Sequence, residues 1–177
     1  CLFYLADTNE KNKIHKQDHL RDAFIKTAAA ETFLAWQYYK KKNSSRGNLD
    51  EKLKQGEIPS EFFRSMFYTY GDYRDIFFDT DISKKENYVL NAKEIIDKIF
   101  PNIDGKTPDE GRKAWWDEIK KDVWDGMLCG LSHASGNISN VETIKNNNTY
   151  STIKFSGSNS PSPGNLRTTT PVFKMDD

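Results

Sequence analysis

The sequence predicts an all-α protein, a helical bundle with long polar loops, and three observations lead to this prediction. Apolar residues recur three and four positions apart in several stretches, which places them on one face of a helix. Residues 19–42 contain no Gly or Pro and are rich in Ala, the best helix former. A further stretch, from Thr107 to Glu110, has the residue types of a helix start.

The N-terminal part predicts a short segment followed by a long helix. The apolar residues 1–6 favour a short helix or an extended segment, with a polar loop after it. Asp18 is the expected N-cap of the helix over 19–42. Glu31 lies within the apolar stripe of this helix, beside small Ala residues that let another helix approach, so we expect a buried carboxylate there. Residues 43–56 predict a loop with a helical turn at 49–53.

The chain is organised around residues 60–81, SEFFRSMFYTYGDYRDIFFDTD, which are rich in aromatic side chains. This stretch predicts a core helix that Ser60 caps and Gly71 interrupts. Charges among aromatic residues need partners, because a buried unpaired ion is far costlier than a paired one. We therefore expect Arg74 to pair with Glu31 across packed helices.

Two more helices complete the predicted core. Residues 83–99 are amphipathic, and Pro101 and Gly105 end that helix. The next begins at Thr107 with a capping box and loses regularity near Gly130. Its apolar face carries three structural tryptophans, Trp115, Trp116 and Trp124.

The composition changes at Ser132, after which Ser, Thr and Asn dominate. We therefore divide the chain into a helical core over residues 1–131 and a loop-rich region over 132–177. The few apolar anchors of the second region are chiefly Ile144, Tyr150, Ile153 and Phe155.

Charge and hydropathy exclude some classes of partner. The 26 basic residues balance the 26 acidic ones, so no net field favours nucleic acid. No apolar run approaches the ~20 residues that span a bilayer. The chain begins at Cys1, and we interpret it as a fragment of a longer protein. Cys1 and Cys129 either form one disulfide or are free thiols.

No catalytic, metal-binding or cofactor-binding pattern emerges, so we expect neither an enzyme nor a cofactor. His15 and His19 have the spacing of zinc ligands on a helix but lack a third ligand nearby. A calcium loop starting at Asp79 would need Gly and Glu where Lys84 and Leu90 stand. Phosphate loops, serine-nucleophile elbows and dinucleotide fingerprints are absent from the sequence.

A lysine cluster ends the long helix. Lys40, Lys41 and Lys42 are either a site for sulfated polysaccharide or a solvated face that complements the helix dipole.

Three stretches carry a resemblance to a known family: FIKTAAAETFLAWQYYK, EIPSEFFRSMFYTYGDYRDIFFDTDI and AWWDEIKKDVWDGMLCGLSHAS. Their sequence and order resemble the Duffy-binding-like (DBL) domains of the variant erythrocyte membrane adhesins of Plasmodium falciparum, the malaria parasite, and most of all the beta class. The chain departs from many relatives at Thr27 and Phe77, where those carry cysteines.

The resemblance implies a Duffy-binding-like helical fold, here mainly the middle subdomain, with the last subdomain missing. It implies disulfide bonds for Cys1 and Cys129, with partners that lie outside this chain. It also implies a place on the extracellular face of the infected erythrocyte, within a larger protein that is membrane-anchored elsewhere. The implied function is cytoadhesion to a host receptor, with roles in virulence and antigenic variation.

Some members of the beta class bind intercellular adhesion molecule one, so this molecule is the receptor that the resemblance implies. The expected contact region is the loop 137–166, whose candidate contact residues are Asn146, Tyr150, Lys154 and Phe155. One alternative is binding of a glycosaminoglycan, heparan or chondroitin sulfate, through the lysine cluster. Another is a scaffold that binds no receptor and is recognised by antibodies.

Overall fold

The computed structural model describes residues 2–80, 87–101, 109–136 and 138–151. These residues form eight α-helices and two 3-10 turns: α1 (Phe3–Ala6), α2 (Thr8–Lys11), α3 (Gln17–Lys42), η1 (Ser44–Arg46), α4 (Leu49–Lys54), α5 (Ser60–Phe78), α6 (Asn87–Ile99), α7 (Asp109–Ala134), η2 (Ile138–Asn140) and α8 (Val141–Asn147). No strand occurs within these ranges, which confirms the predicted all-α class.

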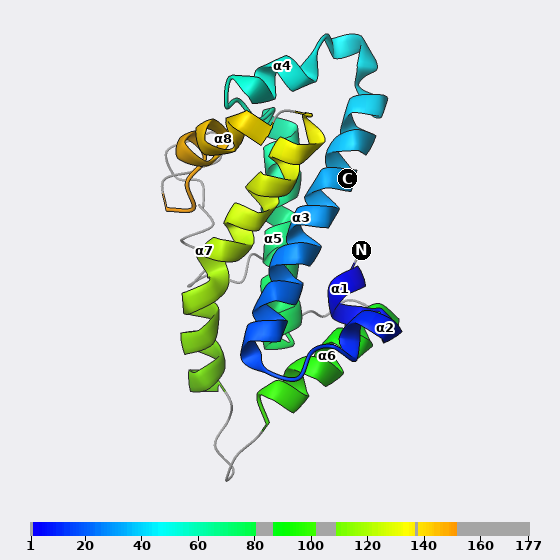
Figure 1. Ribbon diagram of the computed structural model, residues 1–177, viewed down its shortest axis with the longest axis vertical. Coiled ribbons are helices and arrows are strands. Elements are labelled where there is room, and N and C mark those ends of the chain that lie inside the picture. The colour runs from blue at the N-terminus through cyan, green and yellow to red at the C-terminus, as the bar shows by residue number, and fades with distance from the viewer. Residues whose placement is uncertain (1, 81–86, 102–108, 137, 152–177) are drawn as a thin grey trace, which may run out of the picture.

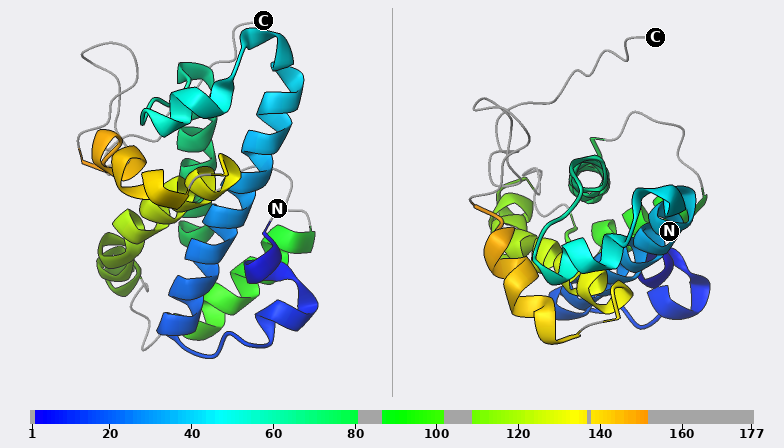
Figure 2. Two further views of the ribbon diagram at one scale, coloured as in Figure 1. Left: turned by 45° about the horizontal axis from the view of Figure 1, so that its top comes forward. Right: turned by 90° about the horizontal axis from the view of Figure 1, so that it is seen from above.

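Three long helices, α3, α5 and α7, form the bundle, and the shorter helices lie toward its two ends (Figure 1). α3 and α7 run side by side in the same direction, whereas α5 runs in the opposite direction (Figure 2). α1, α2 and α6 gather toward the end where α3 begins, and α4 and α8 lie toward the other end.

Two contacts fix the parallel register of α3 and α7. Near the start of α3, the Arg21 guanidinium lies 2.7 Å from the Asp122 carboxylate. Near its end, the Gln37 amide donates to the Ala134 carbonyl at 3.1 Å.

Glycines on α7 allow these two helices to pack backbone against backbone. A Cβ added to Gly126 would lie 3.1 Å from the Ile25 carbonyl oxygen, and one added to Gly130 only 2.1 Å from the Ala29 carbonyl oxygen. The expected loss of regularity near Gly130 is wrong, because α7 continues to Ala134. Gly130 therefore allows α3 and α7 to pack closely and does not mark a helix end.

Aromatic side chains fill the space between α3, α5 and α7. Phe77 of α5 is fully buried, and its ring centre lies 5.0 Å from that of Trp115 and 5.6 Å from that of Trp116. Trp124 is also fully buried and meets Phe63 edge to face at 5.7 Å. All three tryptophans on α7 are therefore core residues.

The boundaries of the helices differ in detail from those expected. α5 passes through Gly71 without interruption, because one glycine costs a helix only about 1 kcal/mol and the core residues on either side of it, Tyr70 and Tyr73, are buried. The N-cap of α3 is Lys16 and that of α5 is Pro59, rather than Asp18 and Ser60. Residues 81–86, and the predicted capping residues Thr107 and Pro108, lie outside the described residues.

The central charges pair differently from the prediction. The carboxylate of Glu31 accepts a hydrogen bond from the Tyr73 hydroxyl, which joins α3 to α5. The Arg74 guanidinium instead lies 3.7 Å from Asp75 and 5.6 Å from the centre of the Phe78 ring. Consecutive helical residues point about 100° apart, so Tyr73 faces α3 while Arg74 turns to the side.

The cysteines are not joined within the described part of the chain. Cys129 is a half-buried free thiol on α7. Cys1 lies outside the described residues. Disulfide bonds to partners beyond this chain stay a prediction, as does the division at residue 131.

Candidate functional site

The described part of the predicted contact loop is ordered as η2 and α8, and Ile144 anchors it. Ile144 is fully buried on a helix of only seven residues. Such a short helix gains little from its own hydrogen bonds, so its position depends on contacts with the rest of the fold.

Asparagine side chains fasten α8 to the end of α4. Asn140 donates to the Lys54 carbonyl at 2.7 Å, and Asn148 donates to the carbonyls of Gly56 at 3.1 Å and Ile144 at 2.8 Å. Gly56 has φ +80°, and a Cβ there would lie 2.3 Å from the Asn147 amide nitrogen. Only glycine fits this position without strain and without displacing Asn147.

Two aromatic residues of the core, Trp124 and Tyr70, form hydrogen bonds with the residues that follow α8. The Trp124 indole donates to the Asn148 carbonyl at 2.9 Å. The hydroxyls of Tyr70 and Tyr150 lie 3.3 Å apart, and their ring centres are 5.9 Å apart. α8, Asn148 and Tyr150 are therefore part of the packed structure rather than of a free loop.

The four predicted contact residues differ in where they lie in the structure. Asn146 is exposed on α8. Tyr150 is only 9% exposed, and its ring packs on the core with the Lys120 ammonium 6.0 Å from the ring centre. Lys154 and Phe155 lie outside the described residues. Asn146 is thus the member of the set that the structure places on the surface, and Tyr150 acts mainly as an anchor.

A polar groove of about 650 Å³ separates α7 from α8. It contains four charged side chains, two of each sign, together with polar residues and the edge of Tyr150. The lining residues are Lys121, Asp125, Glu142, Lys145, Asn146, Thr149, Tyr150 and Ser151.

Asp125 is a half-buried residue of the groove, and the pKa of its carboxyl is shifted. Burial raises the pKa of its carboxyl above the ordinary value, and Lys145 and Lys121 oppose this shift. The negative charges of Asp122 and Glu142 raise the pKa further. Sequence reasoning missed the charged residues of the groove, because α7 and α8 meet there only through the folded chain.

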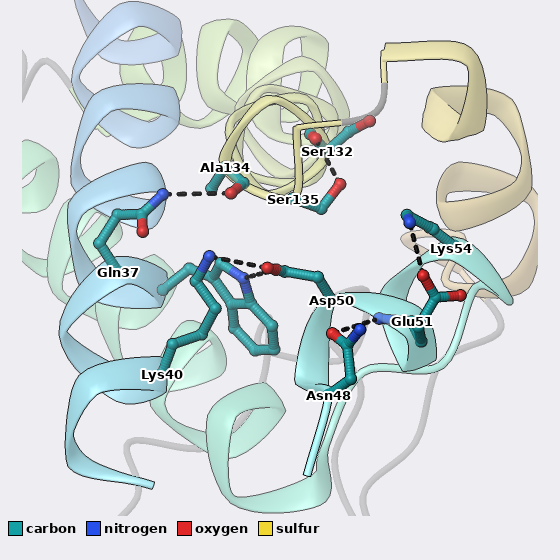
Figure 3. Close-up of polar contacts among 10 residues, drawn as sticks. Gln37, Lys40, Asn48, Asp50, Glu51, Lys54, Ser132, Ala134 and Ser135 are labelled. Carbon is teal, nitrogen blue, oxygen red and sulfur yellow. Dashed lines mark hydrogen bonds and ion pairs between the residues drawn. The ribbon is translucent and has the colours of Figure 1, made fainter. Parts of the chain in front are cut away.

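The lysine cluster at the end of α3 is only partly available. Figure 3 shows the Lys40 ammonium directed at Asp50, at 2.9 Å, and the other oxygen of that carboxylate accepts from the Trp36 indole at 2.9 Å. Lys41 and Lys42 are exposed. A polyanion at this end would therefore meet two free ammonium groups and one that is already neutralised.

Metal chemistry finds no support in the described ranges, where no group of three or more His, Cys, Asp or Glu side chains could hold an ion. The His15 amide donates to Nδ1 of His19 at 3.3 Å, so one ring nitrogen is used within the protein. None of the helices described is long and apolar enough to cross a membrane.

Comparison with known proteins gives one match. The family model of the Duffy binding domain matches residues 1–166 of the 177. No curated protein and no solved structure matches the chain.

Proposed function

The chain belongs to the Duffy binding domain family, whose members are extracellular adhesion modules for host cell-surface receptors, and we propose that it mediates cytoadhesion from the infected erythrocyte. The family match over residues 1–166 is the observation that carries this proposal. The parent protein is a variant adhesin anchored in the erythrocyte membrane outside this chain, subject to antigenic variation.

We propose the α7–α8 groove as the receptor-contact surface. α8 is held by Asn140, Asn148 and Ile144, so binding needs little ordering of this segment. A pre-formed surface keeps more of its interaction energy as affinity. Asn146 on the groove rim is exposed and available for contact.

Intercellular adhesion molecule one is the first receptor to test, because the sequence resembles the beta class of DBL domains. Purified chain is immobilised and exposed to a panel of purified human receptors that includes this molecule, with surface plasmon resonance as the readout. We expect saturable binding to one protein of the panel.

Two variants locate the surface. Asn146→Arg places a bulky charge on the rim and should weaken binding by about tenfold or more, because it obstructs a packed contact. Lys98→Glu, on the exposed face of α6 toward the opposite end of the bundle, is the matched surface control and should leave binding unchanged. Equal binding by all three proteins would move the contact surface elsewhere, and no binding across the panel would favour the non-binding, antibody-recognised scaffold.

Glycosaminoglycan binding is a second candidate, and exposed Lys41 and Lys42 favour it. It predicts heparin retention that falls steeply with salt, since ion pairing in solvent is screened. Lys41→Gln with Lys42→Gln should abolish retention, whereas Lys40→Gln should change it little because Asp50 already neutralises Lys40. Heparin retention that survives the double substitution would rule this site out.

A further inference from the structure

Asp125 differs from the two other half-buried carboxylates described on α7, Asp117 and Asp122, in having no counter-ion within 4 Å. Asp117 lies 2.8 Å from the Lys120 ammonium, and Asp122 lies 2.7 Å from the Arg21 guanidinium. Among the described residues, by contrast, no cation lies within 4 Å of the Asp125 carboxylate, and no donor is hydrogen-bonded to it. Of the two carboxylates that line the groove, Asp125 is the half-buried one and Glu142 is exposed, so the lack of an ionic partner matters most at Asp125.

Burial without such a partner disfavours the charged carboxylate. Partial removal from water raises the pKa of Asp125, and the more distant Lys145 and Lys121 do not cancel this effect. Ion pairs or hydrogen bonds normally accompany a desolvated charge, because leaving it alone costs stability. A half-buried carboxylate that lines a groove and has a raised pKa is a candidate binding residue.

The groove has room for an incoming side chain beside Asp125. Its volume of about 650 Å³ is far larger than one side chain, and α8 on its far wall is fixed by Asn148. A second carboxylate, Glu142, lies on the same groove and adds to the negative potential at Asp125. A bare metal ion fits poorly, because two lysines line the groove and only two carboxylates face it.

We propose that the groove receives an arginine or lysine side chain from the bound receptor, with the Asp125 carboxylate as its counter-ion. The proposal rests on the receptor-binding function and on the groove as its surface. Lys121 and Lys145, which also line the groove, then face acidic or carbonyl oxygens that flank the basic residue in the receptor. The free carboxylate gains in the complex the charged partner that it lacks in the free chain.

The test uses a probe that does not depend on knowing the receptor. The full chain, labelled with ¹³C and ¹⁵N, is titrated with the short peptide acetyl-Gly-Arg-Glu-amide and followed by NMR at the Asp125 carboxyl carbon. The control peptide carries citrulline, which has the shape of arginine without its charge. We expect the arginine peptide to shift the Asp125 signal saturably and to lower its pKa, and the citrulline peptide to bind about tenfold more weakly or worse.

Asp125→Asn and Asp122→Asn form the matched pair of variants. Asp125→Asn should remove peptide binding and raise the urea midpoint of unfolding, because it removes a desolvated charge. Asp122→Asn should leave peptide binding intact and lower the urea midpoint slightly, because it breaks the pair with Arg21.

Two outcomes would overturn the proposal. One is an Asp125 signal that responds equally to both peptides or to neither. The other is a loss of stability in Asp125→Asn, which would show that Asp125 has an internal ionic partner in solution. Failure of the receptor panel with a positive peptide result would overturn only the proposed receptor class, so the two proposals are tested separately.

Discussion

The Tyr73 hydroxyl donates to the Glu31 carboxylate, and this bond ties the aromatic helix α5 to α3 at the centre of the bundle. Tyr73 is buried, with 1% of its surface exposed, whereas Glu31 is half-buried. The half-buried Glu31 carboxylate therefore has a hydrogen-bond donor from the facing helix, which offsets part of the cost of removing it from water.

Replacing Tyr73 by Phe should destabilise the fold by about 1.5–3 kcal/mol, the usual range for a hydrogen bond to a charged group. The ring stays in the core, so the loss of stability reflects the missing hydrogen bond from the hydroxyl to the Glu31 carboxylate. Urea unfolding followed by tryptophan fluorescence measures the change. Arg74→Met is the control and should cost less than about 1 kcal/mol, since Arg74 is only near Asp75 at 3.7 Å. An equal cost for both variants would instead support pairing of Arg74 with Glu31 in solution.

Alkaline pH should destabilise the protein through the buried tyrosines. Burial, and secondarily Tyr150, raise the pKa of Tyr70, while burial followed by the Glu31 charge raise that of Tyr73. A raised folded pKa contributes stability that is fully present below about pH 10, the ordinary tyrosine pKa of the unfolded chain. This stability is lost as the pH rises further, because the unfolded chain ionises first.

The measurement for this pH effect is the free energy of unfolding in urea across the alkaline range. Tyr73→Phe should flatten the decline, because one raised pKa is removed. Tyr88→Phe is the control, since Tyr88 is 58% exposed and should leave the slope unchanged. A slope that is the same in all three proteins would mean that other groups govern alkaline unfolding.

The sequence predicted the helices better than their contacts. Amphipathic spacing is a local property, so the long helices and the buried Trp115, Trp116 and Trp124 follow from it. The prediction that the helix loses regularity near Gly130 was wrong because it used local propensity alone, in which glycine disfavours a helix. In the fold, the close backbone contact with Ala29 requires a glycine at this position. The spacing of Gly126 and Gly130, four residues apart on one face, was the available signal.

The candidate site was predictable only in its location. The polar composition after Ser132 indicates a surface segment, and Asn146 does lie on the surface. Nothing local shows that Asn148 reaches Gly56, which lies 92 positions earlier, or that this contact places α8 opposite Asp125. Such pairings depend on loop closure between distant segments, which residue spacing does not encode.

Gly130→Ala should destabilise the fold by about 1–3 kcal/mol or more, because its Cβ would lie 2.1 Å from the Ala29 carbonyl oxygen and neither helix can yield locally. Gly71→Ala is the matched control in a helix with open space around the added methyl group. It should stabilise by about 0.4–1 kcal/mol by restricting the unfolded chain. Thermal unfolding followed by circular dichroism compares the two, and a neutral Gly130→Ala would show that α3 and α7 are further apart in solution.

Asn148→Ala should release α8 while leaving the three-helix core folded. The Asn148 side chain is buried and donates to Gly56 and Ile144, so its loss leaves a buried carbonyl of Gly56 without a donor, at a cost of about 1–3 kcal/mol. Amide hydrogen exchange should therefore accelerate across 141–147 and remain slow in the centres of α3 and α5, because local opening involves only the weakly anchored segment.

Asn146→Ala is the control, since Asn146 is exposed and its replacement should change stability by less than about 0.5 kcal/mol. Because α8 forms one wall of the groove, the released variant should also lose the arginine peptide, although Asp125 itself is intact. Retained peptide binding with a mobile α8 would mean that α7 alone carries the site.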